Sequence, residues 1–181
     1  MLYLIGLNFA LRSGDEHRNL TVDQFEIDKD DTGEFLLYSE KTSKCYQRGL
    51  KDFGVPPKCV RAYASDDRNK CVVAIFRKYC SLRPTNSRVM YLRPLVKPRD
   101  DQWYSQQAVG KHTLQQTVGK MCKQAGFEGF YSNHSLRATC ATRLFQSGID
   151  EQLIARTTGH RSTAVREYKR VSTAQEKESA T

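Results

Sequence analysis

The chain has 181 residues, with 29 lysines and arginines against 20 aspartates and glutamates, and a net charge of +9. This length suits one domain with a hydrophobic core. With 39% hydrophobic and 27% charged residues, the composition excludes a membrane protein and a disordered polyelectrolyte. The longest apolar stretch, residues 1–11, is too short to span a bilayer and lacks the basic region of a signal peptide.

Six cysteines are scattered along the chain without a Cys-x-x-Cys or Cys-x-x-His pair. This usage is typical of reduced thiols in an intracellular protein, and it argues against a disulfide framework or a zinc site. We therefore expect a protein that is not secreted and not bound to a membrane.

The positive charge is unevenly distributed. Residues 1–31 hold three basic and seven acidic residues, so the whole positive excess lies in residues 32–181. It is densest in residues 41–61 and 156–170. Separated basic segments that converge after folding are typical of nucleic-acid-binding proteins. A basic surface that only keeps the protein soluble fits the composition equally well.

Apolar spacing predicts a buried helix over residues 1–11 and, after a turn at 13–16, a short second helix that carries His17. Alternation then predicts strands around residues 25–27 and 35–38, joined by a hairpin turn at Asp30–Gly33. A third strand is expected over residues 45–50, and a further short extended piece over 59–63.

The rest of the chain has mainly helical spacing. Helices are expected around residues 72–82, 114–122, 136–145, 149–154 and 162–171, with a long loop over 84–105 that holds one extended piece near 89–92. The pattern therefore predicts a mainly α fold with one small antiparallel β-sheet (α+β). We expect Trp103 to pack rather than to stack on bases, and His17 and His112 to lie on the surface.

Three short segments near the carboxyl end carry side chains suited to phosphate chemistry. His134 and Arg137 are three residues apart at a helix start, so both can address one anion. Gly159-His160 follows at a turn between helices, and Tyr168 lies in a strongly basic setting that would stabilise its phenolate as a nucleophile. Taken singly, each has an ordinary alternative as a helix cap, a helix stop or a stacked side chain.

Together these segments resemble the carboxyl-terminal signature of the tyrosine recombinases, or phage-integrase family. That family pairs the signature with an upstream Leu-Arg-x-x-Glu motif, which residues 11–16 match with Asp15 or Glu16 in the acidic place. Residues 6–18, 43–44, 159–162 and 168–170 are also similar to the Crypton branch, whose domain occurs domesticated in zinc-finger MYM-type proteins. The resemblance covers residues 1–171, implies the catalytic-domain fold of that family and leaves residues 172–181 as a polar tail.

The resemblance implies roles for four cationic residues. Arg12 and Arg137 would clamp the non-bridging oxygens of one DNA phosphate, since a guanidinium stays charged and binds two oxygens. A lysine on the turn between two strands would protonate the leaving 5′ oxygen, and Lys44 is the first choice, with Lys41 as the alternate.

It also implies that His134 and His160 donate hydrogen bonds to the phosphate or move the proton of Tyr168, which forms a 3′-phosphotyrosyl link. Such a site needs no metal or other cofactor. The implied partner is double-stranded DNA, and an active domain would assemble as a homo-tetramer on two duplexes. Further basic residues expected to contact DNA are Lys41, Arg48, Lys51, Arg161, Arg166, Lys169 and Arg170.

Three departures from the family pattern favour an alternative. The spacing from His160 to Tyr168 is one residue short, which is expected to displace Tyr168 by a quarter turn of helix. We expect this chain to be a catalytic half without the core-binding domain that recombinases carry before the arginine helix, and 13 residues follow Tyr168 in the sequence. The alternative is a domesticated, non-catalytic DNA-binding module of a transcription or chromatin protein, and a type IB topoisomerase-like nickase is a third hypothesis. A eukaryotic protein of this kind would be nuclear, and a bacterial one cytoplasmic or nucleoid-associated.

Overall fold

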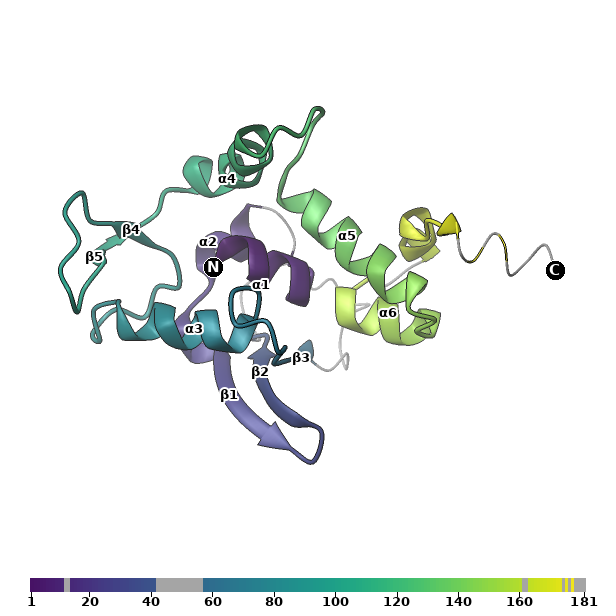
Figure 1. Cartoon of the computed structure of the whole chain (residues 1–181), viewed down its shortest axis with the longest axis horizontal. Helices are drawn as coiled ribbons and strands as arrows, with labels where there is room; N and C mark the ends of the chain where they lie inside the picture. Colours follow the sequence, from purple (N-terminus) through teal and green to yellow (C-terminus); the bar gives the residue numbers. More distant parts are fainter. Residues whose placement is uncertain (12–13, 42–56, 161–162, 174, 176, 178–181) are drawn as a thin grey trace, which may run out of the picture.

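The computed structural model describes residues 1–11, 14–41, 57–160, 163–173, 175 and 177 (Figure 1). It is mostly helical with two small antiparallel sheets, which confirms the predicted fold class but not the single sheet. In chain order the elements are α1 (Leu2–Phe9), α2 (Asp15–Asn19), the 3-10 turn η1 (Val22–Gln24), β1 (Phe25–Asp30), β2 (Gly33–Ser39), β3 (Cys59–Tyr63), α3 (Val72–Ser81), β4 (Leu92–Pro94), β5 (Tyr104–Ala108), α4 (Lys111–Gln124), α5 (Asn133–Gln146), α6 (Glu151–Thr158) and the 3-10 helix η3 (Thr163–Tyr168).

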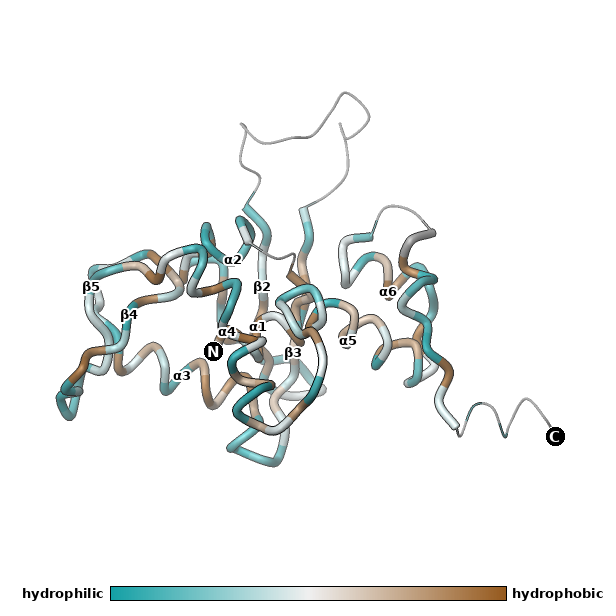
Figure 2. The backbone as a smooth tube through the Cα atoms, turned by 90° about the horizontal axis from the view of Figure 1, so that it is seen from above, coloured by the Kyte–Doolittle hydropathy of each residue, from teal (hydrophilic) through white to brown (hydrophobic). Residues whose placement is uncertain are grey.

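Helix α1 runs through the middle of the molecule and organises the core (Figures 1 and 2). Its residues Ile5 and Phe9 are completely buried. Helix α5 crosses α1 closely at Gly6, where a Cβ atom would lie 2.6 Å from Cδ1 of Leu136. Only glycine allows this approach without displacing Leu136, so Gly6 fixes the position of α5, which carries two of the predicted site residues.

The first sheet has the order β1-β2-β3 and is antiparallel throughout. Strands β1 and β2 pair from Phe25 with Tyr38 to Asp30 with Gly33, as the sequence predicts. A carboxylate oxygen of Asp30 accepts hydrogen bonds from the turn amides of Thr32 (2.9 Å) and Gly33 (3.3 Å). The predicted strand at 45–50 lies outside the described residues, and β2 pairs instead with the extended piece expected at 59–63, now strand β3.

A second sheet corrects the prediction of a long loop over residues 84–105. Strands β4 and β5 form an antiparallel hairpin at the left of Figure 1. Residues 104–108 read Tyr-Ser-Gln-Gln-Ala, which lacks the β-branched residues that signal a strand. The hairpin is held by its surroundings: Tyr79 donates a hydrogen bond to the Met90 carbonyl, and the ring centroids of Tyr79 and Tyr104 lie 4.9 Å apart.

Helices α5, α6 and η3 enclose a smaller core of their own. Ala141, Ile154 and Val165 are buried there. The last segment is a 3-10 helix, where we expected an ordinary helix over residues 162–171. The Thr142 hydroxyl donates to the Tyr168 carbonyl at 2.7 Å, which takes up a carbonyl that a longer helix would use. Among the described helices, none is long and apolar enough to cross a membrane.

His17 is completely buried, so the expectation that it lies on the surface is wrong, whereas His112 is exposed as expected. The charged neighbours Glu16 and Arg18 give its segment the pattern of a surface helix. The ring nevertheless points inward, with Nδ1 3.0 Å from the Tyr91 hydroxyl. Burial lowers the pKa of His17 from 6.5 to about 4.

This burial predicts an acid-sensitive fold. Between pH 6.5 and about 4, the unfolded chain binds a proton at His17 that the folded chain does not. The free energy of unfolding should therefore fall as the pH falls through this window, by roughly 3 kcal/mol. Urea unfolding at several pH values measures this loss.

In His17→Gln, which keeps a hydrogen-bonding side chain but cannot titrate here, this contribution should vanish. The matched control is His112→Gln at an exposed position, which should leave the pH dependence unchanged. Identical pH profiles for wild type and His17→Gln would contradict the assignment.

Candidate functional site

The carboxyl end of α1 provides the base of the candidate site. Its C-cap, Ala10, has φ of 47° and ψ of 44°, the left-handed conformation that is uncommon outside glycine and often marks functional sites. Two cationic side chains bind the adjacent carbonyls here: Arg137 Nη1 donates to Ala10 O at 2.8 Å, and Lys58 Nζ donates to Phe9 O. A helix carboxyl terminus carries partial negative charge, which favours both. Arg12 follows two residues later and lies outside the described residues.

The first turn of α5 places His134 and Arg137 on one face. The helix begins at Ser132, which forms a reciprocal capping box with Ser135. The amide of Asn133 donates to the Leu114 carbonyl at 3.3 Å and so joins this helix start to α4. Because i and i+3 side chains point the same way, exposed His134 and buried Arg137 address one region from different depths.

His160 reaches Arg137 from the turn after α6. Gly159 ends α6 in the left-handed conformation, with φ of 69°, which glycine adopts at no steric cost. The imidazole Nε2 of His160 then lies 3.4 Å from Arg137 Nε, and Nδ1 lies 2.6 Å from the Thr158 hydroxyl. Arg137 is thus held from two sides, by a main-chain carbonyl and by an imidazole.

Tyr168 completes the cluster in spite of its shortened spacing. Its hydroxyl lies 2.9 Å from His134 Nε2, and its ring centroid lies 5.2 Å from that of His160. Tyr168 therefore lies within hydrogen-bond distance of His134, although the spacing from His160 is short.

Lys58 is a site residue that the sequence did not reveal. It comes directly before β3 and, among the described lysines, it alone binds the same helix end as Arg137. Burial, followed by the charge of Arg137, lowers the pKa of Lys58 from 10.5 to about 8. No sequence pattern singles out Lys58, because a lysine before an extended segment is common in proteins of every kind.

Several predicted residues lie elsewhere or outside the described residues. Lys41 forms an ion pair with Asp23 at 2.5 Å and donates a hydrogen bond to the Thr21 hydroxyl at 2.9 Å. Arg166 and Lys169 both pair with Glu151 on α6 and so fasten η3, and Arg170 is exposed. Outside the described residues lie Arg12, Lys44, Arg48, Lys51 and Arg161.

The arrangement suits attack on a phosphodiester. Tyr168 offers a nucleophilic oxygen with His134 Nε2 at hydrogen-bond distance to take its proton. Arg137 and Lys58 offer positive charge for the phosphate and for the leaving oxygen. Within the described part of the chain, no group of three His, Cys, Asp or Glu side chains converges as a metal site.

Comparison with known families agrees with this geometry. Residues 72–175 match the model of the phage integrase family. The match spans more than half of the chain and includes His134, Arg137, His160 and Tyr168. The chain belongs to the phage integrase family. It also belongs to a family described as a domain of unknown function (DUF3504), whose model matches residues 1–123. No curated protein matched the sequence.

Solved integrase-family structures have the same fold. The XerH site-specific recombinase bound to palindromic difH substrate, a post-cleavage complex, superposes with a TM-score of 0.59 at 19% identity, over 99% of this chain and 43% of that chain. XerA recombinase gives 0.60 at 17% identity, over 97% and 52%. The Tn1549 transposon integrase in complex with circular intermediate DNA gives 0.51 at 11%, over 98% and 56%. The chain thus spans about half the length of these proteins.

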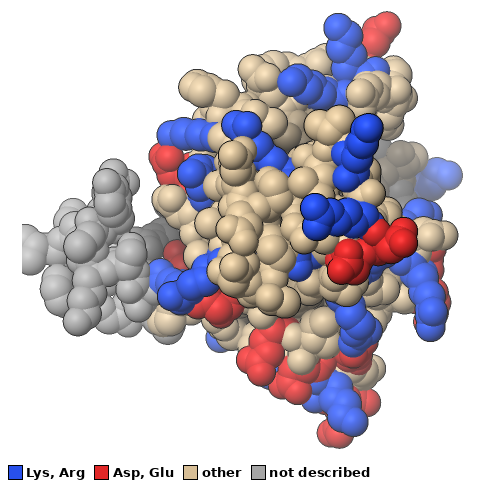
Figure 3. All heavy atoms as spheres, turned by 90° about the vertical axis from the view of Figure 1, so that its left-hand side faces the viewer, with Lys and Arg blue, Asp and Glu red and all other residues tan. Residues whose placement is uncertain are grey.

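A second feature of this integrase-family domain was not predicted, namely the exposed face of α4. Helix α4 contains three lysines, three glutamines and a histidine but no acidic residue. Basic side chains predominate toward the top of Figure 3, the side on which α4 lies in Figure 1, and acidic ones gather toward the bottom, where the β1–β2 hairpin projects. The exposed polar residues of α4 are Lys111, His112, Gln115, Gln116, Lys120, Lys123 and Gln124.

Proposed function

We propose that this domain breaks and rejoins DNA strands through a covalent 3′-phosphotyrosyl intermediate, as a site-specific tyrosine recombinase. The observation that carries the proposal is the contact of the Tyr168 hydroxyl with His134, in a cluster that also holds Arg137 and His160. Membership of the phage integrase family supports it. The relatives crystallised as XerH and Tn1549 complexes contain DNA.

The reaction balances with the residues of the site. The Tyr168 oxygen attacks phosphorus as its proton passes to His134 Nε2, and the bond from phosphorus to the 5′ oxygen breaks. Arg137, together with Arg12 of the family motif, stabilises charge on the non-bridging oxygens. The 5′ oxygen leaves as a hydroxyl after taking a proton. In the reverse direction a 5′ hydroxyl attacks the phosphotyrosine and restores Tyr168. The phosphotyrosyl bond thus conserves the energy of the phosphodiester bond that was broken.

We assign the proton that reaches the leaving oxygen to Lys58, with Lys44, the lysine implied by the family resemblance, as the competing candidate. The lowered pKa, about 8, makes Lys58 a better proton donor near neutral pH than an ordinary lysine. Cleavage should therefore decline as the pH rises through about 8, because Lys58 loses its proton there.

Lys58→Ala should slow strand cleavage by about 10²-fold, within the range for loss of a general acid. A DNA substrate with sulfur in place of the leaving 5′ oxygen needs no proton, because a thiolate is a good leaving group. Cleavage of that substrate by Lys58→Ala should return to within a few-fold of wild type. Rescue of Lys44→Ala, with no rescue of Lys58→Ala, would assign the acid to Lys44 instead.

The face of α4 is proposed to lie in a DNA groove next to the site. Lysines suit phosphates and guanines, glutamines suit adenines, and a helix fits the major groove. The hydrogen bond from Asn133 to Leu114 holds this helix against the start of α5, so DNA bound there would pass beside His134.

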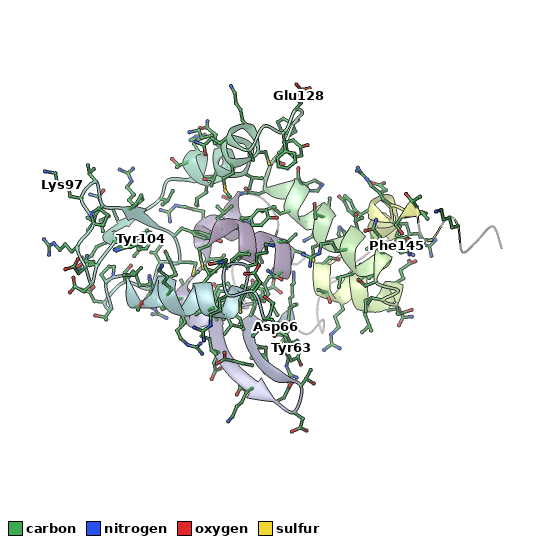
Figure 4. The ribbon with its side chains drawn as sticks, in the orientation of Figure 1. Tyr63, Asp66, Lys97, Tyr104, Glu128 and Phe145 are labelled. Atoms are coloured by element: carbon green, nitrogen blue, oxygen red, sulfur yellow. The ribbon has the colours of Figure 1, made fainter. Side chains whose placement is uncertain are left out.

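Removing two lysine charges from α4 tests this interface. The double variant Lys120→Gln and Lys123→Gln should weaken DNA binding by about tenfold and lower the slope of log affinity against log salt by about 1.8. Titration of labelled duplex at several salt concentrations measures both. The matched control, Lys29→Gln with Lys97→Gln, removes two exposed charges from β1 and from the far end of the β4–β5 hairpin (Figure 4). An equal loss in the control would contradict the proposed face.

Covalent capture tests the activity without knowledge of the target sequence. The substrates are nicked duplexes with randomised sequence around the nick. Cleavage next to the nick releases a short fragment, so the strand cannot be religated. The protein then stays covalently bound to DNA during denaturing electrophoresis. Wild-type protein should give an adduct, and sequencing of the captured DNA should give a common motif. Tight DNA binding without any adduct would contradict the enzyme and support the alternative, a non-catalytic DNA-binding module. Plasmid relaxation without recombination would instead favour the topoisomerase-like nickase.

Within the family, we propose that this domain is of the Crypton type. The alternative is one of the related domesticated domains of zinc-finger MYM-type proteins. The Crypton assignment is supported by the similarity of residues 6–18, 43–44, 159–162 and 168–170. We further propose a tetramer on two duplexes, and a nuclear location in a eukaryotic cell. Mass photometry of the captured complex and fractionation of expressing cells test these two points, and a monomer on one duplex or a cytosolic protein would contradict them.

A further inference from the structure

Thr158 is completely buried next to the site and has no part in the reaction described above. Its hydroxyl oxygen lies 2.6 Å from the carbonyl oxygen of Ile154 and 2.6 Å from Nδ1 of His160. The first contact is the usual one between a helical threonine and the carbonyl four residues earlier. The second joins the last turn of α6 to the imidazole that contacts Arg137.

The protons of this pair of contacts can be counted. A hydroxyl has one proton, and the carbonyl of Ile154 can only accept. If Thr158 donates to Ile154, its oxygen must accept a proton from Nδ1 of His160. The neutral imidazole then has its lone pair on Nε2. If Thr158 donated to Nδ1 instead, Nε2 would carry the proton.

Arg137 decides between these two arrangements. A guanidinium has donors only, and its Nε lies 3.4 Å from Nε2 of His160. Nε2 must therefore be the acceptor, which requires the proton of the neutral ring on Nδ1. The contacts at the two ring nitrogens thus agree on one tautomer.

We propose that Thr158 is a positioning residue that fixes the Nδ1–H tautomer of His160, so that His160 orients the guanidinium of Arg137 toward the phosphate. The consequence for the reaction rests on the proposed function. The two histidines then have different roles. His134 contacts the nucleophile, whereas His160 holds the arginine from the side opposite Ala10. With both Nε and Nη1 held, little rotation of the guanidinium remains, and a fixed fork recognises phosphate more strongly than a mobile one.

The competing tautomer would disrupt this arrangement. With its proton on Nε2, His160 would point an N–H at the Nε–H of Arg137, and two donors would face each other. Without the Thr158 hydroxyl, no contact at Nδ1 would select between the two tautomers of His160. Removing the hydroxyl should therefore release the ring, while a serine should restore the contact because it keeps an oxygen at the same position.

The test compares Thr158→Val, Thr158→Ser and a control, Thr157→Val, which removes a hydroxyl from the neighbouring, half-buried position. Long-range proton–nitrogen correlation spectra, recorded with His160 neutral, report which ring nitrogen carries the proton. Wild type, Thr158→Ser and Thr157→Val should show the Nδ1–H form, and Thr158→Val should lose it. In covalent capture, Thr158→Val should be ten- to a hundredfold slower and Thr158→Ser within about threefold of wild type.

An Nε2–H tautomer in wild type, or an unchanged tautomer in Thr158→Val, would overturn the assignment. So would a loss of cleavage in Thr158→Ser as large as in Thr158→Val. Because the spectra need no DNA, the tautomer can be judged apart from the activity. A wild-type protein with the Nδ1–H form that cleaves no DNA supports the role of Thr158 in the ring and contradicts the recombinase proposal.

Discussion

Tyr168→Phe should abolish covalent capture of DNA, with no adduct above the level of a sample without protein. The substitution removes one oxygen, the nucleophile, and nothing else in the described site offers a replacement at that position beside His134. DNA affinity should stay within about fivefold of wild type, because one hydrogen bond to an exposed histidine contributes about 1 kcal/mol or less. Covalent capture and equilibrium binding, measured on the same nicked duplexes, separate the two effects.

The matched control for this substitution is Tyr104→Phe. Tyr104 packs on Tyr79 in the second sheet, on the opposite side of the molecule from Phe145, which lies beside η3 (Figure 4). It should retain the adduct at the wild-type level. If Tyr168→Phe still forms adduct, another side chain is the nucleophile, and the mechanism proposed for this site is wrong.

Arg137→Lys should lower the rate of cleavage by about 10³-fold, although the positive charge is kept. A lysine amine cannot bind the Ala10 carbonyl, contact His160 and present two further donors to a phosphate, whereas the guanidinium fork has five N–H groups. Loss of one preorganised donor to a developing oxyanion typically costs 10²–10³-fold. Single-turnover cleavage rates, measured at saturating protein, report this loss apart from DNA binding.

Arg143→Lys is the control on the same helix, because Arg143 is exposed and lies two turns farther along α5. It should cleave at the wild-type rate. Thermal unfolding of Arg137→Lys distinguishes a folded but slow enzyme from an unfolded one. A folded Arg137→Lys protein that cleaves within tenfold of wild type would contradict the role of the guanidinium.

The sequence predicted the helices and the first hairpin well because their signals are local. Apolar spacing marks α1, α3, α4, α5 and α6, and the Asp30–Gly33 turn marks the hairpin. The hairpin β4–β5 was missed because its polar residues form a strand only where Tyr79 and the neighbouring chain hold it. Burial of His17 was missed for a similar reason, since its neighbours in sequence are charged while its neighbours in space are not.

The site was predictable as far as it rests on motifs. His134, Arg137, His160 and Tyr168 do come together, although they span 35 residues of sequence. Lys58, Thr158 and the α4 face carry no motif, and the role of each depends on a contact seen only in the structure. Lys58 contacts the end of α1, Thr158 contacts the ring of His160, and α4 contacts the start of α5.

Mass spectrometry of the trapped protein–DNA adduct tests the central claim most directly. After nuclease and trypsin digestion, the peptide of residues 167–169 should gain the mass of a 3′-linked nucleotide phosphate, and fragmentation should locate it on Tyr168. Absence of the modification in a digest of captured adduct, or its presence on another residue, would contradict the proposal that Tyr168 is the nucleophile.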